Sequence, residues 1–159
     1  LRFSDVNLHL TGGWTGDDTK YLKQQKKKLI DARLMHQVKI WDEFEGAHRM
    51  EFLRQVQLIS VPVRNGEAFG IYLSEAMASG IPVVQPRLGA FPEIIETAGG
   101  GVVYEPNTPE ALSEALSSLL DNPSKIEQLS IEARQSVEAH FDINKQAAKM
   151  VDVYQRLLK

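Results

Sequence analysis

The sequence predicts an α/β fold in which a Rossmann-like parallel sheet carries helices on both faces. Short apolar stretches alternate with longer stretches whose apolar residues recur at helical spacing, an order typical of β-α-β units. The strand candidates also contain runs of Val and Ile that need cover on both sides. With 159 residues, of which 43% are hydrophobic, the chain has enough apolar material for the core of one domain over 1–159.

The predicted strands are rich in β-branched residues and end at Gly, Pro or polar turns. They cover residues 6–10, 38–44, 58–63, 82–86 and 101–105. The predicted helices between them cover residues 17–34, 47–54, 70–79 and 92–97. From residue 108 onward, a Thr-Pro-Glu start and apolar residues at helical spacing predict a helix, and two more follow at 124–140 and 142–158.

Charge and composition exclude several kinds of partner and cofactor. Eighteen basic and 21 acidic residues give a net charge of −3, which argues against a nucleic-acid partner. The chain has no cysteine and its histidines form no ligand pair, so we expect no disulfide, no bound metal and no other cofactor. The run Lys26, Lys27 and Lys28 is interpreted as a solvated helix face, because consecutive helical residues point in different directions.

The sequence also bears on where the protein works. It contains no apolar run of the roughly 18 residues that span a bilayer, and no signal peptide. We therefore expect a cytoplasmic protein, and peripheral attachment of a full-length parent to the inner face of the membrane is left open. Because the chain begins with Leu1 rather than Met, we expect it to be a piece of a longer protein.

The stretch GEAFGIYLSEAMASGIPVV (66–84) follows the third predicted strand, at the edge of the sheet where such folds bind ligands. The helix predicted to begin near Gly70 leaves the amides of Ile71 and Tyr72 without acceptors, and these suit a diphosphate. Glu67 and Glu75 would repel phosphate, but they are well suited to accept hydrogen bonds from sugar hydroxyls. These residues together indicate a nucleotide sugar.

The same residues carry a resemblance to a known family. EAFGIYLSEAMASGIPVV, followed by LGAFPEII (88–95), closely resembles the donor-site signature of the retaining, group 1 glycosyltransferases of the GT-B fold. That signature has a Glu, any residue, Phe and Gly, a second Glu eight positions after the first, then Ala, a small residue, Gly and Pro. Each of these positions is filled. The tail HFDINKQAAKMVDVYQRLL (140–158) is similar to the closing helix of the family, so the resemblance spans nearly the whole chain.

The resemblance implies a role for each matched residue. Glu67 would act in catalysis through the hydroxyls of the donor sugar, and Glu75 would bind the ribose. Backbone contacts to the sugar and the diphosphate would come from the loop and the first helical turn, at Gly66, Phe69, Gly70, Ile71 and Tyr72. Three residues keep two interpretations: Trp41 as the nucleobase contact or as core, Gly89 as a ligand contact or a tight turn, and Glu93 as a ligand contact or a helix start.

The resemblance also implies that parts are missing. The family has a further strand before VNLHL (6–10), which ends in an arginine and a nearby lysine that neutralise the diphosphate, and it has an N-terminal acceptor domain. Neither is present in this sequence. We therefore interpret the chain as the C-terminal, donor-binding domain of a retaining transferase that uses a nucleoside diphosphate sugar. We expect the fragment alone to be inactive, and a homodimer of the fragment is left open.

The sequence also bears on two other functions. A nucleotide-sugar-binding module without catalysis, kept for regulation or assembly, remains as the alternative. A dehydrogenase is disfavoured because TGGWTG (11–16), after the first strand, lacks the Gly-x-Gly-x-x-Gly spacing of dinucleotide-binding folds.

Overall fold

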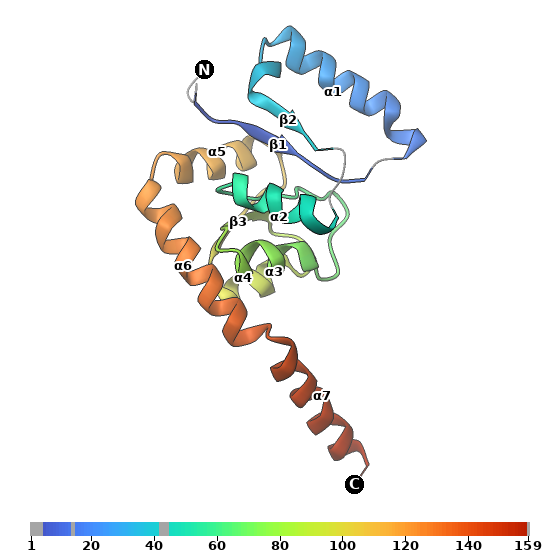
Figure 1. Cartoon of the computed structure of the whole chain (residues 1–159), viewed down its shortest axis with the longest axis vertical. Coiled ribbons are helices and arrows are strands. Elements are labelled where there is room, and N and C mark those ends of the chain that lie inside the picture. Colours follow the sequence, from blue (N-terminus) through green and yellow to red (C-terminus); the bar gives the residue numbers. More distant parts are fainter. Residues whose placement is uncertain (1–4, 14, 42–44, 159) are drawn as a thin grey trace. The chain divides into compact units, whose positions relative to one another are not determined.

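The computed structural model describes residues 5–13, 15–41 and 45–158 (Figure 1). The chain divides into two compact units, the N-terminal unit (Leu1–Val56) and the C-terminal unit (Gln57–Lys159). Each unit contains its own pair of parallel strands. The sequence predicted a single sheet, so the division into two pairs is a finding of the structure.

The N-terminal unit is a β-α-β unit followed by a helix. Strand β1 (Leu8–Leu10) lies parallel to β2 (Val38–Ile40), and α1 (Thr19–Asp31) forms the crossover between them. The pairing extends one residue further, because the Trp41 amide donates to the Leu10 carbonyl at 2.8 Å. Short 3-10 helices at Gly16–Asp18 and Met35–Gln37 flank α1, and α2 covers Gly46–Gln55.

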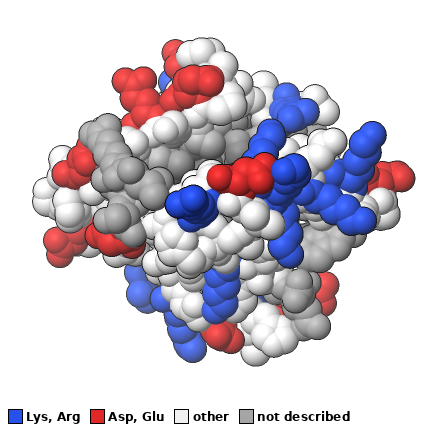
Figure 2. Space-filling view, turned by 90° about the horizontal axis from the view of Figure 1, so that it is seen from above, with Lys and Arg blue, Asp and Glu red and all other residues white. Residues whose placement is uncertain are grey.

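Helix α1 contains no buried residue. Lys26, Lys27 and Lys28 are all exposed, and Lys27 pairs with Asp31 one turn later at 2.9 Å. Such an exposed pair contributes little to stability. Figure 2 shows basic and acidic side chains exposed on the surface. The exposure of the three lysines fits the solvated face that the sequence predicted for them.

The C-terminal unit places two parallel strands between helices. Strand β3 (Val83–Pro86) pairs with β4 (Gly101–Tyr104), and every residue of β3 is buried. On one face of the sheet, Val84 and Tyr104 pack with residues of α5 (Pro109–Leu120) and α6 (Pro123–His140). Helices α3 (Ile71–Ala78) and α4 (Phe91–Ala98) also pack on β3. Because neighbouring strand residues point to opposite faces, burial along all of β3 requires cover on both sides.

The last three helices begin where the sequence predicted them. Thr108, Asn122 and Asp142 each accept a hydrogen bond from the amide three residues later, which satisfies one of the amides left open at a helix start. Proline at the first position of α5 and of α6 adds a residue whose backbone angle already suits a helix. Helix α7 (Ile143–Leu157) contains no buried residue.

The strand predicted over 58–63 is wrong in its extent. Only Ile59 forms a bridge, opposite Val83, with the Ile59 amide donating to Pro82 and the Val84 amide donating to Ile59. One step further along a parallel ladder, the amide of residue 86 would donate to Val61, but Pro86 has no N–H.

The Val61 amide instead donates to the side-chain Oε1 of the wholly buried Gln85, at 3.2 Å. Proline therefore ends the pairing, and a buried amide side chain replaces the backbone acceptor. The predicted strand over 38–44 is shorter as well: β2 ends at Ile40, and 42–44 lie outside the described residues.

Candidate functional site

The predicted site residues of the C-terminal unit gather around the loop that leads into α3. Glu67 is half-buried and its side chain accepts two hydrogen bonds. Oε1 accepts from the Ala68 amide at 3.0 Å, and Oε2 accepts from the Tyr72 hydroxyl at 3.3 Å. A carboxylate can accept about four hydrogen bonds, so these two leave acceptor capacity for further donors.

Gly70 caps α3 in the left-handed conformation, with φ of 79° and ψ of 65°, which side chains rarely adopt. It provides no side-chain cap, and the first amides of a helix have no acceptor within the helix. The amides of Ile71 and Tyr72 therefore form the N-terminal end of α3, as the sequence predicted. An added Cβ at Gly70 would lie 3.2 Å from Glu67 Cγ, a tight contact, so packing against Glu67 also favours glycine at this position.

A second loop, just before α4, contacts the backbone of Glu67. The Ala90 amide donates to the Glu67 carbonyl at 3.0 Å, just before α4 begins. Gly89 has φ of 57°, and an added Cβ there would lie 2.6 Å from the Glu67 amide nitrogen, closer than real contacts allow. The turn interpretation of Gly89 is therefore sufficient to explain this glycine, and the turn serves to place Glu67. Glu93 lies exposed in the first turn of α4, where a helix start favours an acidic residue.

The Tyr72 side chain is the feature that the sequence analysis missed, because only its amide was assigned. Burial first, and then the charge of Glu67 and the hydrogen bond to it, raise the pKa of Tyr72 to about 12. The phenol therefore keeps its proton, and its hydrogen bond to Glu67, to a higher pH than an ordinary tyrosine would. The only signal in the sequence was the spacing of five residues between Glu67 and Tyr72 across a turn into a helix.

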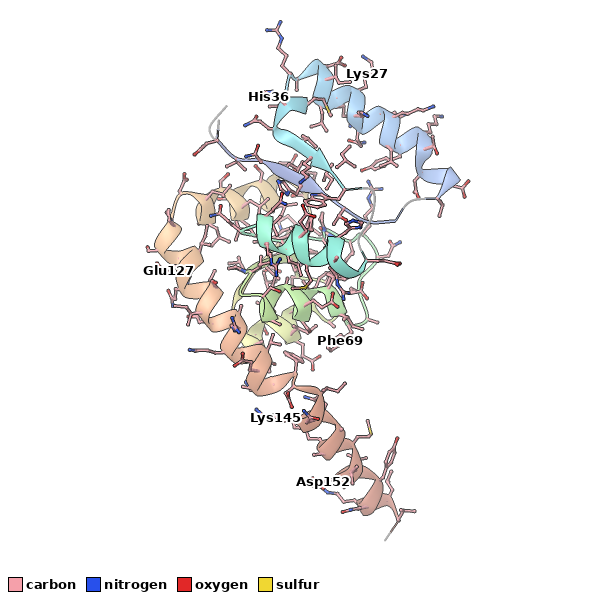
Figure 3. All side chains as sticks on the ribbon, viewed as in Figure 1. Lys27, His36, Phe69, Glu127, Lys145 and Asp152 are labelled. Atoms are coloured by element: carbon pink, nitrogen blue, oxygen red, sulfur yellow. The ribbon has the colours of Figure 1, made fainter. Side chains whose placement is uncertain are left out.

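The other predicted residues of α3 and its loop differ in exposure. Glu75 is half-buried in the second turn of α3. Phe69 and Ile71 are 44% and 67% exposed, so burial in the core does not explain these apolar side chains. Phe69 lies beside the start of α3 (Figure 3), and its ring forms a T-shaped pair with that of Phe141, with centroids 6.1 Å apart.

Trp41 lies in the N-terminal unit and is buried among aromatic rings. Its ring lies 5.7 Å from that of Phe52 and 6.0 Å from that of His9, measured between centroids. The Lys39 ammonium lies 3.7 Å from the centroid of the indole. These ring contacts fit the core interpretation of Trp41, and the nucleobase contact stays a prediction.

The described residues contain neither a cluster of metal ligands nor a helix suited to a membrane. Within the described part of the chain, no three His, Asp or Glu side chains come together as metal ligands. No helix of the described residues is both long and apolar enough to cross a bilayer.

Comparisons with known proteins agree on one family. The model of the family described as "Glycosyl transferases group 1" matches residues 1–136. A phosphatidyl-myo-inositol mannosyltransferase of Mycobacterium leprae is 29% identical over 153 residues, which cover 96% of this chain and 38% of that protein. A D-inositol 3-phosphate glycosyltransferase of Xylanimonas cellulosilytica is 26% identical over 155 residues, which cover 98% of this chain and 36% of that protein.

Solved structures show the same fold. The Anabaena HepE protein in complex with UDP matches with a TM-score of 0.81 at 22% identity, over 94% of this chain and 42% of that one. The sucrose-phosphate synthase of Thermosynechococcus elongatus matches with a TM-score of 0.79 at 24% identity, over 96% of this chain and 38% of that one. The chain thus spans less than half the length of these relatives, and its fold is that of the C-terminal domain of a GT-B glycosyltransferase. It belongs to the group 1 glycosyltransferase family.

Proposed function

We propose that this chain supplies the donor site of an enzyme that transfers a sugar from a nucleoside diphosphate sugar with retention of anomeric configuration. The observation that carries the proposal is the position of Glu67. Its carboxylate is held by Ala68 and Tyr72 at the loop that leads into α3, whose first amides are uncapped by a side chain. An acceptor for sugar hydroxyls thus lies near donors suited to phosphate.

The two glutamates divide the donor between them in this proposal. Glu67 accepts hydrogen bonds from hydroxyls of the transferred sugar, and Glu75, further along α3, accepts them from the ribose. The amides of Ile71 and Tyr72 bind the diphosphate, and they stabilise the negative charge that grows on it as the sugar leaves. The new bond forms on the face from which the diphosphate departs, and no resident metal is required.

The relatives support this choice of substrate. They are named as glycosyl- and mannosyltransferases, and HepE structures contain UDP, UDP with glucose, and UDP-glucose. Since the chain covers only 38% of the mannosyltransferase, we assign the acceptor to residues outside this chain. A cytoplasmic location belongs to the same proposal.

A transfer assay on the intact protein tests the proposal. The protein is incubated with a panel of uridine, guanosine and adenosine diphosphate sugars, and release of the diphosphate is followed with and without candidate acceptors. We expect turnover with at least one donor, retention at the anomeric carbon of the product by NMR, and loss of turnover in Glu67→Ala. Tight donor binding without any turnover would indicate a non-catalytic module instead, and no binding of any donor would contradict the donor site.

The isolated chain provides a second test. A helix N-terminus contributes only about 0.3–1 kcal/mol at an exposed site, which is too little to hold a diphosphate tightly without cationic side chains. We expect the 159-residue chain alone to bind nucleotide sugars weakly and to transfer none. Micromolar affinity measured by calorimetry would show that the phosphate site is misplaced.

A further inference from the structure

The orientation of Glu67 depends on one side chain that the donor-site signature does not include. Of its two hydrogen bonds, the bond to Oε1 comes from the Ala68 backbone amide, which only a substitution by proline would remove. The bond to Oε2 comes from the Tyr72 hydroxyl at 3.3 Å. The phenol oxygen of Tyr72 is therefore the point at which this orientation can be changed without altering the carboxylate itself.

The packing around Gly70 brings the two side chains together. A Cβ added at Gly70 would lie 3.2 Å from Glu67 Cγ, 3.3 Å from Tyr72 Cζ and 3.3 Å from Phe91 Cε1. The stem of the glutamate and the ring of the tyrosine thus meet over the bare Cα of the glycine. Phe91 is wholly buried, so it forms a fixed wall beside them. The tyrosine ring thus has packing partners on the side of Glu67, while Tyr72 as a whole is half-buried.

The hydrogen bonds also determine what Glu67 can still accept. Each carboxylate oxygen has two lone-pair sites. Oε1 uses one of them for the Ala68 amide, and Oε2 uses one for the Tyr72 hydroxyl. One site on each oxygen remains, which suits two neighbouring hydroxyls of one sugar. Without the phenol, Oε2 gains a second free lone-pair site and the carboxylate can rotate. It can then present several orientations to the sugar instead of one.

We propose that Tyr72 is a positioning residue, whose hydroxyl fixes the carboxylate of Glu67 and thereby sets which pair of sugar hydroxyls the donor site accepts. The inference rests on the proposed function and deepens it. The phenol is protonated at neutral pH, as a tyrosine with an ordinary pKa already is, and burial and Glu67 raise the pKa of Tyr72 further, to about 12.

The test uses Tyr72→Phe in the intact protein, which removes the hydroxyl and keeps the ring. Tyr104→Phe is the matched control. The hydroxyl of Tyr104, at the end of β4, donates to Asn107 Oδ1 in the following loop at 3.4 Å. We expect Tyr72→Phe to lower kcat/KM for the preferred nucleotide sugar about tenfold, the loss typical of one hydrogen bond to a charged group. The affinity for the free nucleoside diphosphate stays the same, and the preference between donor sugars that differ in one hydroxyl narrows. Tyr104→Phe leaves all three unchanged.

A double variant separates positioning from a general structural role. In a Glu67→Gln background, removal of the Tyr72 hydroxyl has little to act on, so kcat/KM falls less than about twofold further. Two results would overturn this inference even if the wild-type protein turns over its donor: the losses of kcat/KM from the two substitutions simply multiply in the double variant, or Tyr72→Phe behaves like Tyr104→Phe. A wild-type protein that binds no nucleotide sugar would overturn the proposed function itself, and this inference with it.

Discussion

Replacing Gly89 with alanine tests whether the loop before α4 holds Glu67 in place. At this residue φ is 57°, and an added Cβ would lie 2.6 Å from the Glu67 amide nitrogen. Backbone atoms cannot rotate away as the end of a flexible side chain can, so the loop must shift. The shift separates the Ala90 amide from the Glu67 carbonyl, which are 3.0 Å apart in the structure.

The expected cost has two parts. A left-handed backbone at a non-glycine residue costs about 1–2 kcal/mol. Loss of the hydrogen bond from Ala90 to Glu67 adds about 0.5–1.5 kcal/mol. Gly89→Ala should therefore lower the free energy of unfolding by about 1.5–3.5 kcal/mol. Gly66→Ala is the matched control, because φ is 79° there and the nearest atom to an added Cβ lies at an ordinary 3.8 Å. Gly66→Ala should lose only the cost of the left-handed backbone.

Urea unfolding followed by circular dichroism measures both variants against the wild-type chain. Gly89→Ala should lose about 1 kcal/mol more of the free energy of unfolding than Gly66→Ala, which is the value of the broken hydrogen bond. In the intact protein, turnover of the nucleotide sugar should also fall in Gly89→Ala, because the main chain of Glu67 moves. Equal destabilisation in the two variants would show that the Gly89 loop does not press on Glu67.

Three further predictions concern the same site. Glu75→Ala should weaken binding of the free nucleoside diphosphate by roughly 1–3 kcal/mol in the intact protein, whereas Glu67→Ala should spare it and impair turnover; calorimetry that shows equal losses would contradict this division. Gly70→Val should abolish donor binding and also reduce stability, since its side chain would meet Glu67 and Phe91; unchanged affinity in a folded variant would leave Gly70 a purely structural role. The pKa of Tyr72 is raised from 10.0 to about 12, so its contribution to stability is complete below pH 10 and is lost as the pH rises from 10 through 12. Unfolding measured across that range should show a steeper loss in the wild type than in Tyr72→Phe, and parallel curves would refute the contact with Glu67.

Local signals predicted most of the helices and the family. The helix starts at Thr108 and Asn122 carry both a capping side chain and a following proline, so their positions could be predicted to within a residue. The signature around Glu67 and Glu75 identified the family because several residue types at fixed spacing must coincide, and the family match confirms it.

Features that depend on contacts between distant residues could not be predicted in the same way. The strand over 58–63 has the right composition, but its pairing ends because Pro86, on the neighbouring strand, has no amide to donate. Gly89 follows Glu67 by 22 positions, and only the folded loops show that no Cβ fits against the Glu67 backbone. The phenol of Tyr72 was missed for a related reason, since its role depends on the turn at Gly70 bringing it back to Glu67.

If the start of α3 binds the diphosphate of a nucleotide sugar, the backbone amides there respond to the ligand, and amide NMR detects that response. The isotopically labelled chain is titrated with the donor preferred by the intact protein, a measurement that detects weak binding. We predict that the amides of Ile71 and Tyr72 show the largest shifts, and that these shifts diminish in Gly70→Val. Shifts that spare the start of α3 and gather elsewhere in the C-terminal unit would contradict the account.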